Sequence, residues 1–510
     1  MFPMSFLKPL DDILNKITMY RLVLYYLIFL WLAAFNLSFF GFFPFGFIEL
    51  LISSAIIISV SFLTNKLLAR IFNTFTNLES VYISAFILIL IITPARSINE
   101  YIFIILASFF AMASKYILSF NKKHVFNPVA ISVLIMLLFT IGGASWWVGT
   151  TVMLLPVLFG LLVIRKIQRA SLVLTFLITS LSAMEFFSVI SGFDALLILQ
   201  NTLLESPLLF FAFVMLTEPS TTPPRQILQI YYGAIVGILF YPQIHISSFY
   251  FTPEAALVAG NIFSYLVSPK EKLTLSLKEK IKLSKDTYDF VFNLNKKFSF
   301  TPGQYLEWTL GFKNPDSRGN RRYFTIASSP TEENLRIGIK FYPNSSSFKK
   351  NLFSLKPGDK IMAGSLSGDF VLPDDANKKL VFILGGIGIT PFRSIVRYLL
   401  DKNMKIPAVV FYSNKEKSDI VYKDLLDQAE QKLGIKIIYN LTDLESIPKD
   451  WKGEKGRLDE NMLKKYVSDY KERIFYLSGP HSMVMGFEEV LGKMGISKTN
   501  IKKDFFPGYV

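Results

Sequence analysis

The chain has 510 residues, 51% of them hydrophobic, and a mean hydropathy of +0.40. A chain of this length is too long to fold around a single hydrophobic core, so two or three domains are expected. Its mean hydropathy indicates membrane-spanning segments. The absence of cysteine excludes disulfides and cysteine-ligated iron–sulfur clusters, and three histidines are too few for a transmembrane di-haem pair with four axial histidines. An electron path through this chain would therefore need organic cofactors, and no metal site is expected.

Charge is unevenly distributed along the chain. Residues 1–269 hold 13 Lys and Arg and 10 Asp and Glu, whereas residues 270–510 hold 41 and 29. The contrast predicts a membrane domain at 1–268 and a soluble part after it. The basic soluble part suits anionic lipid headgroups or a phosphorylated cofactor, or it is simply a lysine-rich solvated surface. No segment interleaves basic and aromatic residues, so no nucleic-acid partner is expected.

Ten apolar runs predict ten membrane spans, several of them short for a crossing of ~20 residues. Lys and Arg in NKLLAR (65–70) and RKIQR (165–169) fall on the inner side if the N-terminus is cytoplasmic. This arrangement predicts a multi-pass protein of the plasma membrane whose soluble part faces the cytoplasm, where NAD(P)H is found. The runs are 20–40, 44–63, 80–93, 99–118, 124–140, 148–164, 170–190, 204–217, 227–242 and 252–268.

A repeat is visible within these runs. FNPVA (126–130) and FTPEA (251–255) share F-x-P-x-A at an offset of 125 residues, and Pro94 and Pro219 have the same offset. Five spans in each copy would make the second copy inverted across the bilayer. Inverted repeats with proline-interrupted spans usually place a ligand site between the copies. Coincidence among common residues is the alternative.

The strings KKHVFNPVA, MLTEPSTTPPR and TPEAALVAGN resemble the NqrB/RnfD family of membrane proteins. These are the membrane components of two ion-coupled redox complexes, the Na⁺-translocating NADH:quinone oxidoreductase and the Rnf complex, and the resemblance covers about residues 20–268. It implies FMN, which this family attaches to the threonine of an S-G-A-T motif. That motif has no counterpart here, so a noncovalent flavin (FMN or riboflavin) or a quinone would fit the same cleft, and additional redox subunits are compatible with the family.

The candidate membrane site lies at the proline-containing turns of this repeat. Glu218 stands beside Pro219, with functional and structural interpretations equally weighted, whereas snorkelling to the interface is the simpler interpretation for Lys115 and Glu185. The candidate residues are Asn127, Pro128, Thr217, Glu218, Thr221 and Thr222.

From about residue 272, short alternating segments such as KLTLSLKEKIKLS, YDFVFNL and LRIGIKF predict an antiparallel β-barrel domain at 269–375. From 379 the pattern changes to strand–helix–strand units, with KLVFILGG, AVVFYS, IKIIYN and RIFYLSG as strands. This predicts an α/β domain with a parallel nucleotide-binding sheet at 376–510.

Together these two domains resemble the ferredoxin–NADP reductase family. RYFTIAS (322–328) matches its flavin segment, which implies that Arg322 pairs with the FAD pyrophosphate, Phe324 covers the isoalloxazine and Thr325 faces its N5 edge. Gln304 and Tyr305, in FTPGQYLEW, are further FAD candidates. SSSFKKNLFSLKPGDKI implies phosphate contacts from Ser346, Ser347 and Lys349, although an ordinary lysine-rich surface fits this segment equally well.

LGGIGITP (384–391) follows a buried strand and opens a helix, as a nucleotide-binding turn does. Its glycines let the backbone approach a pyrophosphate, and the resemblance places Thr390 and Pro391 near the nicotinamide. At the end of the next strand, Ser413 and Lys415 are candidates for the adenosine side. Lys415 or Lys417 would suit a 2′-phosphate, but both are equally typical of a surface loop, so NADPH and NADH remain open. The glycine candidates are Gly385, Gly386 and Gly388.

LSGPHSM (477–483) matches the family's C-G-P-x-x-M motif, with Ser478 in place of cysteine. The resemblance places Ser478 near the reacting atoms of nicotinamide and flavin, together with Thr325. Phe506 or Tyr509, in the terminal DFFPGYV, would flank the flavin, with core packing as the alternative. The cofactor-binding candidates of this motif are Gly479, Pro480 and Met483.

The two parts together predict a membrane-bound flavin oxidoreductase. It would pass electrons from cytoplasmic NAD(P)H through FAD to a membrane carrier, then to quinone or to an acceptor across the membrane. Two alternatives remain. In the first, the membrane domain would be a channel or transporter regulated by the reductase. In the second, the spans would only anchor an active reductase.

Overall fold

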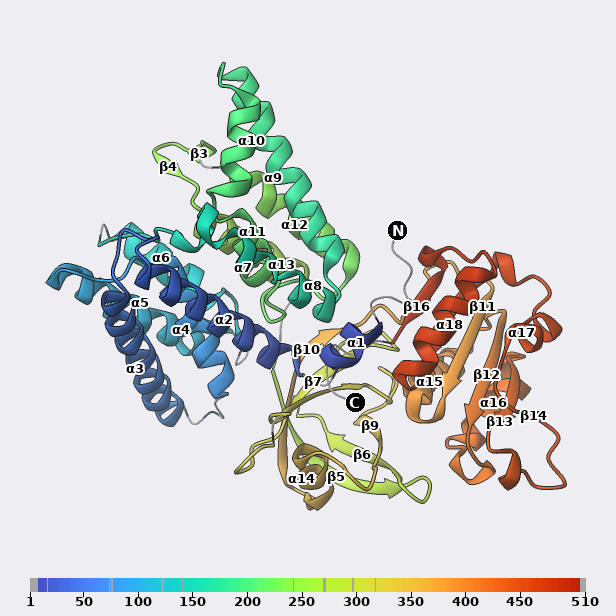
Figure 1. Ribbon diagram of the computed structural model, residues 1–510. Coiled ribbons are helices and arrows are strands. Elements are labelled where there is room, and N and C mark those ends of the chain that lie inside the picture. Colours follow the sequence, from blue (N-terminus) through green and yellow to red (C-terminus); the bar gives the residue numbers. More distant parts are fainter. Residues whose placement is uncertain are drawn as a thin grey trace. The chain divides into compact units, whose positions relative to one another are not determined.

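A computed structural model describes residues 8–15, 17–72, 74, 77–120, 123–139, 141–241, 243–268, 272–295, 298–316 and 318–504. The chain divides into two compact units (Figure 1). A helical unit extends to Lys272, and a second unit, built from strands and helices, begins at Leu273.

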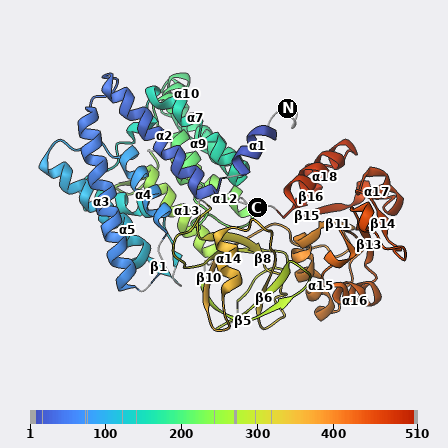
Figure 2. The same cartoon turned by 60° about the horizontal axis from the view of Figure 1, so that its bottom comes forward.

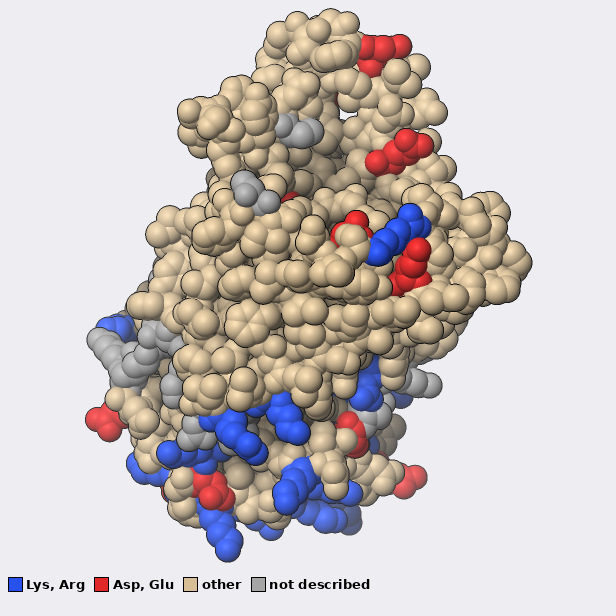
Figure 3. Space-filling view, turned by 90° about the vertical axis from the view of Figure 1, so that its left-hand side faces the viewer, with Lys and Arg blue, Asp and Glu red and all other residues tan. Residues whose placement is uncertain are grey.

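Among the described residues of the helical unit, four helices are long and apolar enough to cross a membrane. They are α2 (Met19–Phe39), α3 (Phe47–Ile71), α5 (Ile98–Ile117) and α9 (Ala170–Ile190). A fifth crossing is possible if α10 (Ala195–Leu204) and the segment Leu208–Met215, bent by 57°, form one span. On the side of the molecule shown in Figure 3, a wide band carries few charged side chains, which suits a lipid-facing surface.

The remaining expected spans are shorter or broken. The run at 148–164 is wrong as one helix. Pro156 lies within the short helix α7 (Leu154–Leu158), where it cannot donate a backbone hydrogen bond to the turn before it, and the chain breaks again at Phe159 and Gly160 before α8 (Leu161–Ile167). The other short elements are α1 (Lys8–Asn15), α4 (Leu78–Ile91), α6 (Pro128–Leu138), α11 (Leu208–Phe210) with the π-helix Phe211–Met215, α12 (Gln226–Leu239) and α13 (Pro253–Val267).

The F-x-P-x-A repeat begins a helix in both copies. Asn127 caps α6 by accepting hydrogen bonds from Val129 N and Ala130 N, and Thr252 caps α13 by accepting one from Ala255 N. In both helices proline occupies the first turn, where its missing N–H costs nothing. A two-residue-strand hairpin precedes each helix, β1 (Ser119–Phe120) with β2 (Lys123–His124), and β3 (His245–Ile246) with β4 (Phe249–Tyr250).

The second unit begins with the expected antiparallel barrel (Figure 2). Its strand order is β8-β7-β10-β5-β6-β9. The outer strands β8 and β9 meet where Ala327 N donates to Arg336 O at 2.7 Å, so the sheet closes on itself. The elements are β5 (Leu273–Lys282), β6 (Thr287–Asn293), β7 (Tyr305–Thr309), β8 (Arg321–Thr325), β9 (Leu335–Lys340), α14 (Ser347–Ser354) and β10 (Lys360–Ser367).

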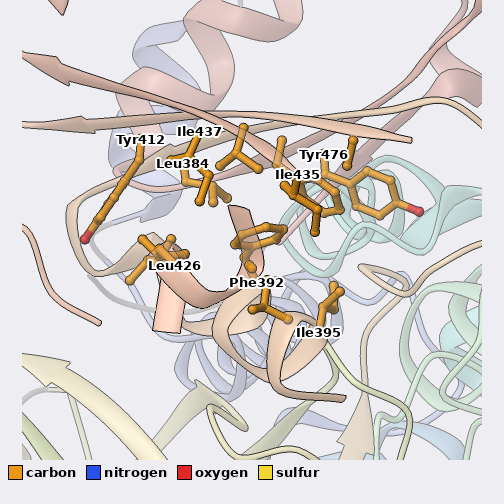
Figure 4. Packing of buried hydrophobic residues seen from close by; sticks show 14 of the residues in the cluster. Leu384, Phe392, Ile395, Tyr412, Leu426, Ile435, Ile437 and Tyr476 are labelled. Carbon is orange, nitrogen blue, oxygen red and sulfur yellow. The ribbon is translucent and has the colours of Figure 1, made fainter. Parts of the chain in front are cut away.

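A parallel sheet follows, with strand order β14-β13-β12-β11-β15-β16. Figure 4 shows how Phe392 and Ile395 of α15 and Leu426 of α16 pack on Tyr412, Tyr476 and other residues of one face. Helices α17 and α18 cover the opposite face. The elements are β11 (Leu380–Gly385), α15 (Thr390–Lys402), β12 (Ala408–Asn414), α16 (Lys423–Leu433), β13 (Lys436–Leu441), β14 (Glu454–Lys455), α17 (Glu460–Tyr466), β15 (Ile474–Ser478), α18 (His481–Lys493) and β16 (Ile501–Lys503).

Candidate functional site

Three cationic side chains gather beside α14 and β8 of the barrel. Arg322 is buried, and its guanidinium stacks on Phe348 at 5.3 Å while Nη1 donates to Arg318 O at 2.7 Å. Lys349 is on the first turn of α14, and it lies close enough to Arg322 and Arg318 for their positive charges to lower its pKa. The ammonium group of Lys349 donates to Lys340 O at 3.0 Å, and Arg318 is paired with Asp316 at 2.9 Å, so the cluster includes one carboxylate beside its three cations.

The pKa of Lys349 reports the electrostatics of this cluster. Burial, followed by repulsion from Arg322 and Arg318, lowers it from 10.5 to about 8. Cations brought together at this cost are a typical arrangement for binding phosphate oxygens, since an anion would restore the ordinary pKa. The residues present therefore fit the FAD pyrophosphate, with Arg322 and Lys349 as the groups that would hold it.

The other flavin-side candidates have defined contacts. The Ser346 hydroxyl caps α14 by accepting from Lys349 N, and Ser347 Oγ accepts from Asp316 N at 2.9 Å. Gln304 Oε1 accepts from Thr301 N at 2.8 Å, and its backbone oxygen accepts from Ile326 N. Gln304 and Ser347 thus shape the turns around the site through contacts within the protein.

Tyr305 and Phe324 lie on the paired strands β7 and β8. Tyr305 is opposite Thr325 in the sheet, and Leu306 is opposite Phe324. The ring centres of Phe324 and Phe348 are 6.0 Å apart, so the aromatic residue expected against the flavin is adjacent to the cationic cluster.

The glycine-rich turn after β11 packs on the turn after β15. A Cβ at Gly388 would lie 2.5 Å from Gly479 N, and one at Gly385 would lie 2.6 Å from Met483 Sδ and 3.0 Å from Pro480 Cδ. Only glycine fits at position 388, where the neighbouring atoms are backbone, whereas the neighbours of Gly385 are side-chain atoms. Gly386 has φ of +52° and open space around it. The two motifs expected to bind the nicotinamide nucleotide therefore form one surface.

The remaining nucleotide-side candidates lie at the carboxyl ends of the same strands. Thr390 Oγ1 donates to Ile387 O at 3.2 Å, and Pro391 fills the first turn of α15. Ser413 Oγ accepts from Asn440 Nδ2 at 3.1 Å, whereas Lys415 is exposed. This edge of a parallel sheet is where nucleotides bind in α/β folds.

Thr325 and Ser478, on different domains, meet at one carboxylate. Thr325 Oγ1 donates to Asp504 Oδ2 at 3.0 Å, and Ser478 Oγ donates to the same oxygen at 3.3 Å. Asp504 follows β16, where its N–H donates to Leu477 O. Burial raises the pKa of Asp504 to about 7, although both hydroxyl donors act to lower it. This carboxyl can therefore hold or release a proton near neutral pH.

Sequence reasoning missed Asp504. The available signal was its position at the start of DFFPGYV, directly before the aromatic tail already considered for the flavin. Phe506 and Tyr509, the two candidates from that tail, lie outside the described residues.

Comparison with protein families agrees with this geometry. Residues 274–371 match the oxidoreductase FAD-binding domain, and residues 382–489 match the oxidoreductase NAD-binding domain. The second unit is an FAD- and NAD(P)H-dependent oxidoreductase. We call it the reductase unit below.

Curated relatives are similar over this part of the chain's length. Flavohemoprotein A of Dictyostelium discoideum is 24% identical over 221 residues, 41% of this chain and 53% of the relative. The glycine betaine monooxygenase reductase subunit of Pseudomonas aeruginosa is 26% identical over 232 residues, 44% and 63%. One subunit of the Na⁺-translocating NADH-quinone reductase of Idiomarina loihiensis is 28% identical over 236 residues, 42% and 56%. The chain thus spans between half and two thirds of the length of these relatives.

Solved structures are also similar. The Amycolatopsis cytochrome P450 reductase has a TM-score of 0.42 at 23% identity, covering 47% of this chain and 70% of that one. The cytochrome b5 reductase domain of Ulva prolifera nitrate reductase has a TM-score of 0.40 at 22% identity, covering 46% and 98%.

The helical unit contains a pocket at the first F-x-P-x-A motif. It is open to the surface and has a cavity volume of about 70 Å³ in this structure. Asn127, Pro128, Thr217 and Glu218 line it, so the pocket includes four of the six membrane-site candidates. Apolar residues of α2, α4, α8 and the π-helix complete the wall: Val23, Ile83, Ile87, Val163, Ile167 and Val214.

Glu218 connects the polar groups at this pocket. Its carboxylate accepts from Asn127 Nδ2 at 2.8 Å and Ser220 Oγ at 2.6 Å, and lies 3.4 Å from His124 Nε2. Thr221 Oγ1 lies 3.4 Å from Glu218 Oε2.

The other candidates nearby are held by different groups. Thr222 accepts a hydrogen bond from Arg169, and Thr217 donates to Phe213 O at 3.0 Å. Lys115 Nζ donates to Ser80 O at 2.9 Å, which gives it a structural contact.

Proposed function

We propose that this protein is a membrane-bound oxidoreductase that delivers electrons from its cytoplasmic reductase unit to a carrier held in the helical unit. The observation that carries the proposal is the pocket lined by Asn127 and Glu218, which occurs in the same chain as an FAD- and NAD(P)H-dependent reductase. The carrier is a quinone or a noncovalently bound flavin. Bound FAD supplies two-electron acceptance from NAD(P)H and one-electron release, which suits such a carrier.

Within the reductase unit, we assign separate tasks to three groups of residues. Arg322, with Lys349, holds the anionic pyrophosphate of FAD. The glycine-rich turn at 385–388, with Gly479, holds the nicotinamide nucleotide against the barrel. The carboxyl of Asp504 keeps the hydroxyls of Thr325 and Ser478 in fixed positions and exchanges a proton with this site.

For the helical unit we propose ten membrane-associated segments in two inverted copies, similar to the NqrB/RnfD membrane proteins. The equivalent capping of α6 and α13, 125 residues apart, supports the repeat. Walls from both copies surround the pocket, since α2, α4 and α6 precede the second copy and the π-helix belongs to it. The final acceptor is quinone or a molecule across the membrane, and further redox subunits are compatible with this role.

A spectroscopic titration tests the proposal. Purified full-length protein in detergent is titrated anaerobically with NADH and with NADPH, and reduction of a short-chain quinone and of ferricyanide is then measured. In Glu218→Gln we expect quinone reduction to fall about ten-fold or more, because the group that organises the pocket is lost, while ferricyanide reduction persists. Glu205→Gln, at an exposed helix end, is the matched control.

Two outcomes would overturn this assignment. One is equal quinone reduction by Glu218→Gln and Glu205→Gln. The other is solute flux through liposomes that needs no NAD(P)H, which would instead make the helical unit a transporter regulated by the reductase.

A further inference from the structure

A buried contact joins the flavin barrel to the nucleotide-binding sheet, through two residues that are not themselves candidate site residues. Tyr422 Oη donates to Asp289 Oδ1 at 2.5 Å. Asp289 lies on β6 of the barrel and is completely buried, whereas Tyr422 directly precedes α16 of the sheet domain. The other carboxylate oxygen of Asp289 pairs with Arg336 Nη1 at 2.9 Å. Burying a carboxylate is costly unless it is paired, so the two partners specify where Asp289 lies.

The backbone of Tyr422 is held in an uncommon conformation. Its φ is +58°, in the left-handed region that bulky side chains rarely adopt. Such a conformation persists where the surroundings fix it, and it often occurs near functional sites. Here the hydrogen bond to Asp289 and the guanidinium of Arg393, 5.8 Å from the Tyr422 ring centre, fix the side chain.

This contact lies next to the start of α15. Gly338 is opposite Asp289 in the barrel, and a Cβ there would come within 2.7 Å of both Thr390 Cγ2 and Tyr422 Oη. Thr390 is the first residue of α15 and ends the glycine-rich turn. The tyrosine hydroxyl and the Thr390 methyl group therefore both pack against Gly338 of the barrel.

Further bonds connect α15 to the same face of the barrel. Arg393 Nη1 donates to Ala327 O at 2.8 Å, and Arg393 Nη2 donates to Glu332 Oε1 at 3.0 Å. Ser394 Oγ donates to Ser328 O at 2.6 Å. These contacts hold α15 along its first turns. Tyr422–Asp289 ties the loop before α16 to the barrel, together with the more exposed pair of Lys340 Nζ and Asp419 Oδ1 at 3.3 Å.

We propose that Tyr422 and Asp289 are positioning residues that set the height of the nicotinamide-binding turn over the flavin barrel. They act through Gly338 and Thr390 and touch no reacting atom. Hydride transfer depends steeply on the distance between donor and acceptor, so a small displacement of the turn lowers the rate more than it lowers binding. This inference rests on the nicotinamide site proposed above.

The test compares Tyr422→Phe with Tyr439→Phe in the full-length protein. Both changes remove one phenol oxygen, but Tyr439 Oη is buried without a hydrogen-bond partner among the described residues. Stopped-flow measurement gives the limiting rate of flavin reduction and the apparent dissociation constant of NADH. Hydrogen–deuterium exchange of the segment 387–402 is measured in flavin-free protein.

For Tyr422→Phe we expect the limiting rate to fall about ten-fold with little change in the dissociation constant, and exchange in 387–402 to increase. Tyr439→Phe should match the unmodified protein in all three. Asp289→Asn, which can still accept from Tyr422, should show an intermediate rate. If a variant loses FAD, the exchange measurement alone decides, because it needs no flavin.

Equal exchange and equal rates in Tyr422→Phe and Tyr439→Phe would overturn the inference. A loss of affinity for NADH at an unchanged limiting rate would also overturn it. Failure of the proposed function is distinct from both, since the flavin of the unmodified protein would then not be reduced by either nucleotide.

Discussion

Replacing Asp504 by Asn should stabilise the reductase unit at alkaline pH and leave its stability nearly unchanged in acid. The Asp504 carboxyl accepts from Thr325 and Ser478 through one oxygen, and no partner for its other oxygen, Oδ1, occurs among the described residues. An asparagine keeps an acceptor for both hydroxyls and removes the buried charge.

The magnitude follows from the pKa of Asp504, which burial raises from 3.8 to about 7. Below pH 3.8 the carboxyl is protonated in both the folded and the unfolded chain, so it has no effect on the pH dependence. Between 3.8 and 7 only the unfolded chain releases its proton, so stability falls as pH rises. Above pH 7 the accumulated cost is about 4 kcal/mol, at ~1.4 kcal/mol for each pKa unit.

Thermal release of FAD, followed by flavin fluorescence, measures this effect in detergent-solubilised full-length protein between pH 5 and 9. The release temperature of Asp504→Asn should exceed that of the unmodified protein at pH 8 to 9, and the difference should shrink steadily toward pH 5. Asp375→Asn, an exposed carboxylate of the same unit, is the control. Parallel pH profiles for Asp504→Asn and the unmodified protein would refute the reasoning.

Three further outcomes are expected. Arg322→Ala should weaken FAD binding to flavin-free protein about ten-fold or more by fluorescence titration. In the unmodified protein the affinity for FAD should fall as pH rises through about 8, where Lys349 loses its charge, and a flat pH profile would contradict this. Gly388→Ala should abolish flavin reduction by NADH while FAD content is retained, because the new Cβ meets Gly479; normal reduction would contradict it. Lys415→Ala should lower the rate of flavin reduction by NADPH more than the rate with NADH, because Lys415 is exposed whereas Lys417 is paired with Asp450 at 3.3 Å; equal rates of the variant and the unmodified protein with NADPH would contradict this.

The barrel and the parallel sheet were predictable because their signals are local. Alternating residues mark the strands of the barrel, and buried runs such as KLVFILGG, followed by glycine, mark the sheet and its nucleotide-binding edge. The order of the motifs then placed Arg322 and Gly388 in separate domains. These features depend on neighbours in the sequence, which the sequence displays directly.

The missed features depend on contacts between distant residues. Thr325 and Asp504 are 179 positions apart, and Asp289 and Tyr422 are 133 positions apart, so no local pattern joins them. The run at 148–164 was wrongly predicted as one span for a different reason. Hydropathy measures apolar composition, and a run such as 148–164 remains apolar although Pro156 interrupts its backbone hydrogen bonding.

The contact between the two copies of the helical repeat is one-sided. Asn261 Oδ1 of α13 accepts from Asn127 N at the start of α6, but the residue 125 positions before Asn261 is Met136, whose side chain has no amide oxygen to accept the equivalent bond from Thr252 N. At the start of α13, the carboxylate of Glu254 instead accepts a hydrogen bond from Trp146 Nε1 at 2.8 Å. The starts of α6 and α13 are thus chemically unequal despite their shared F-x-P-x-A sequence, so a molecule that reached this unit from one end would meet a different set of polar partners than one that reached it from the other.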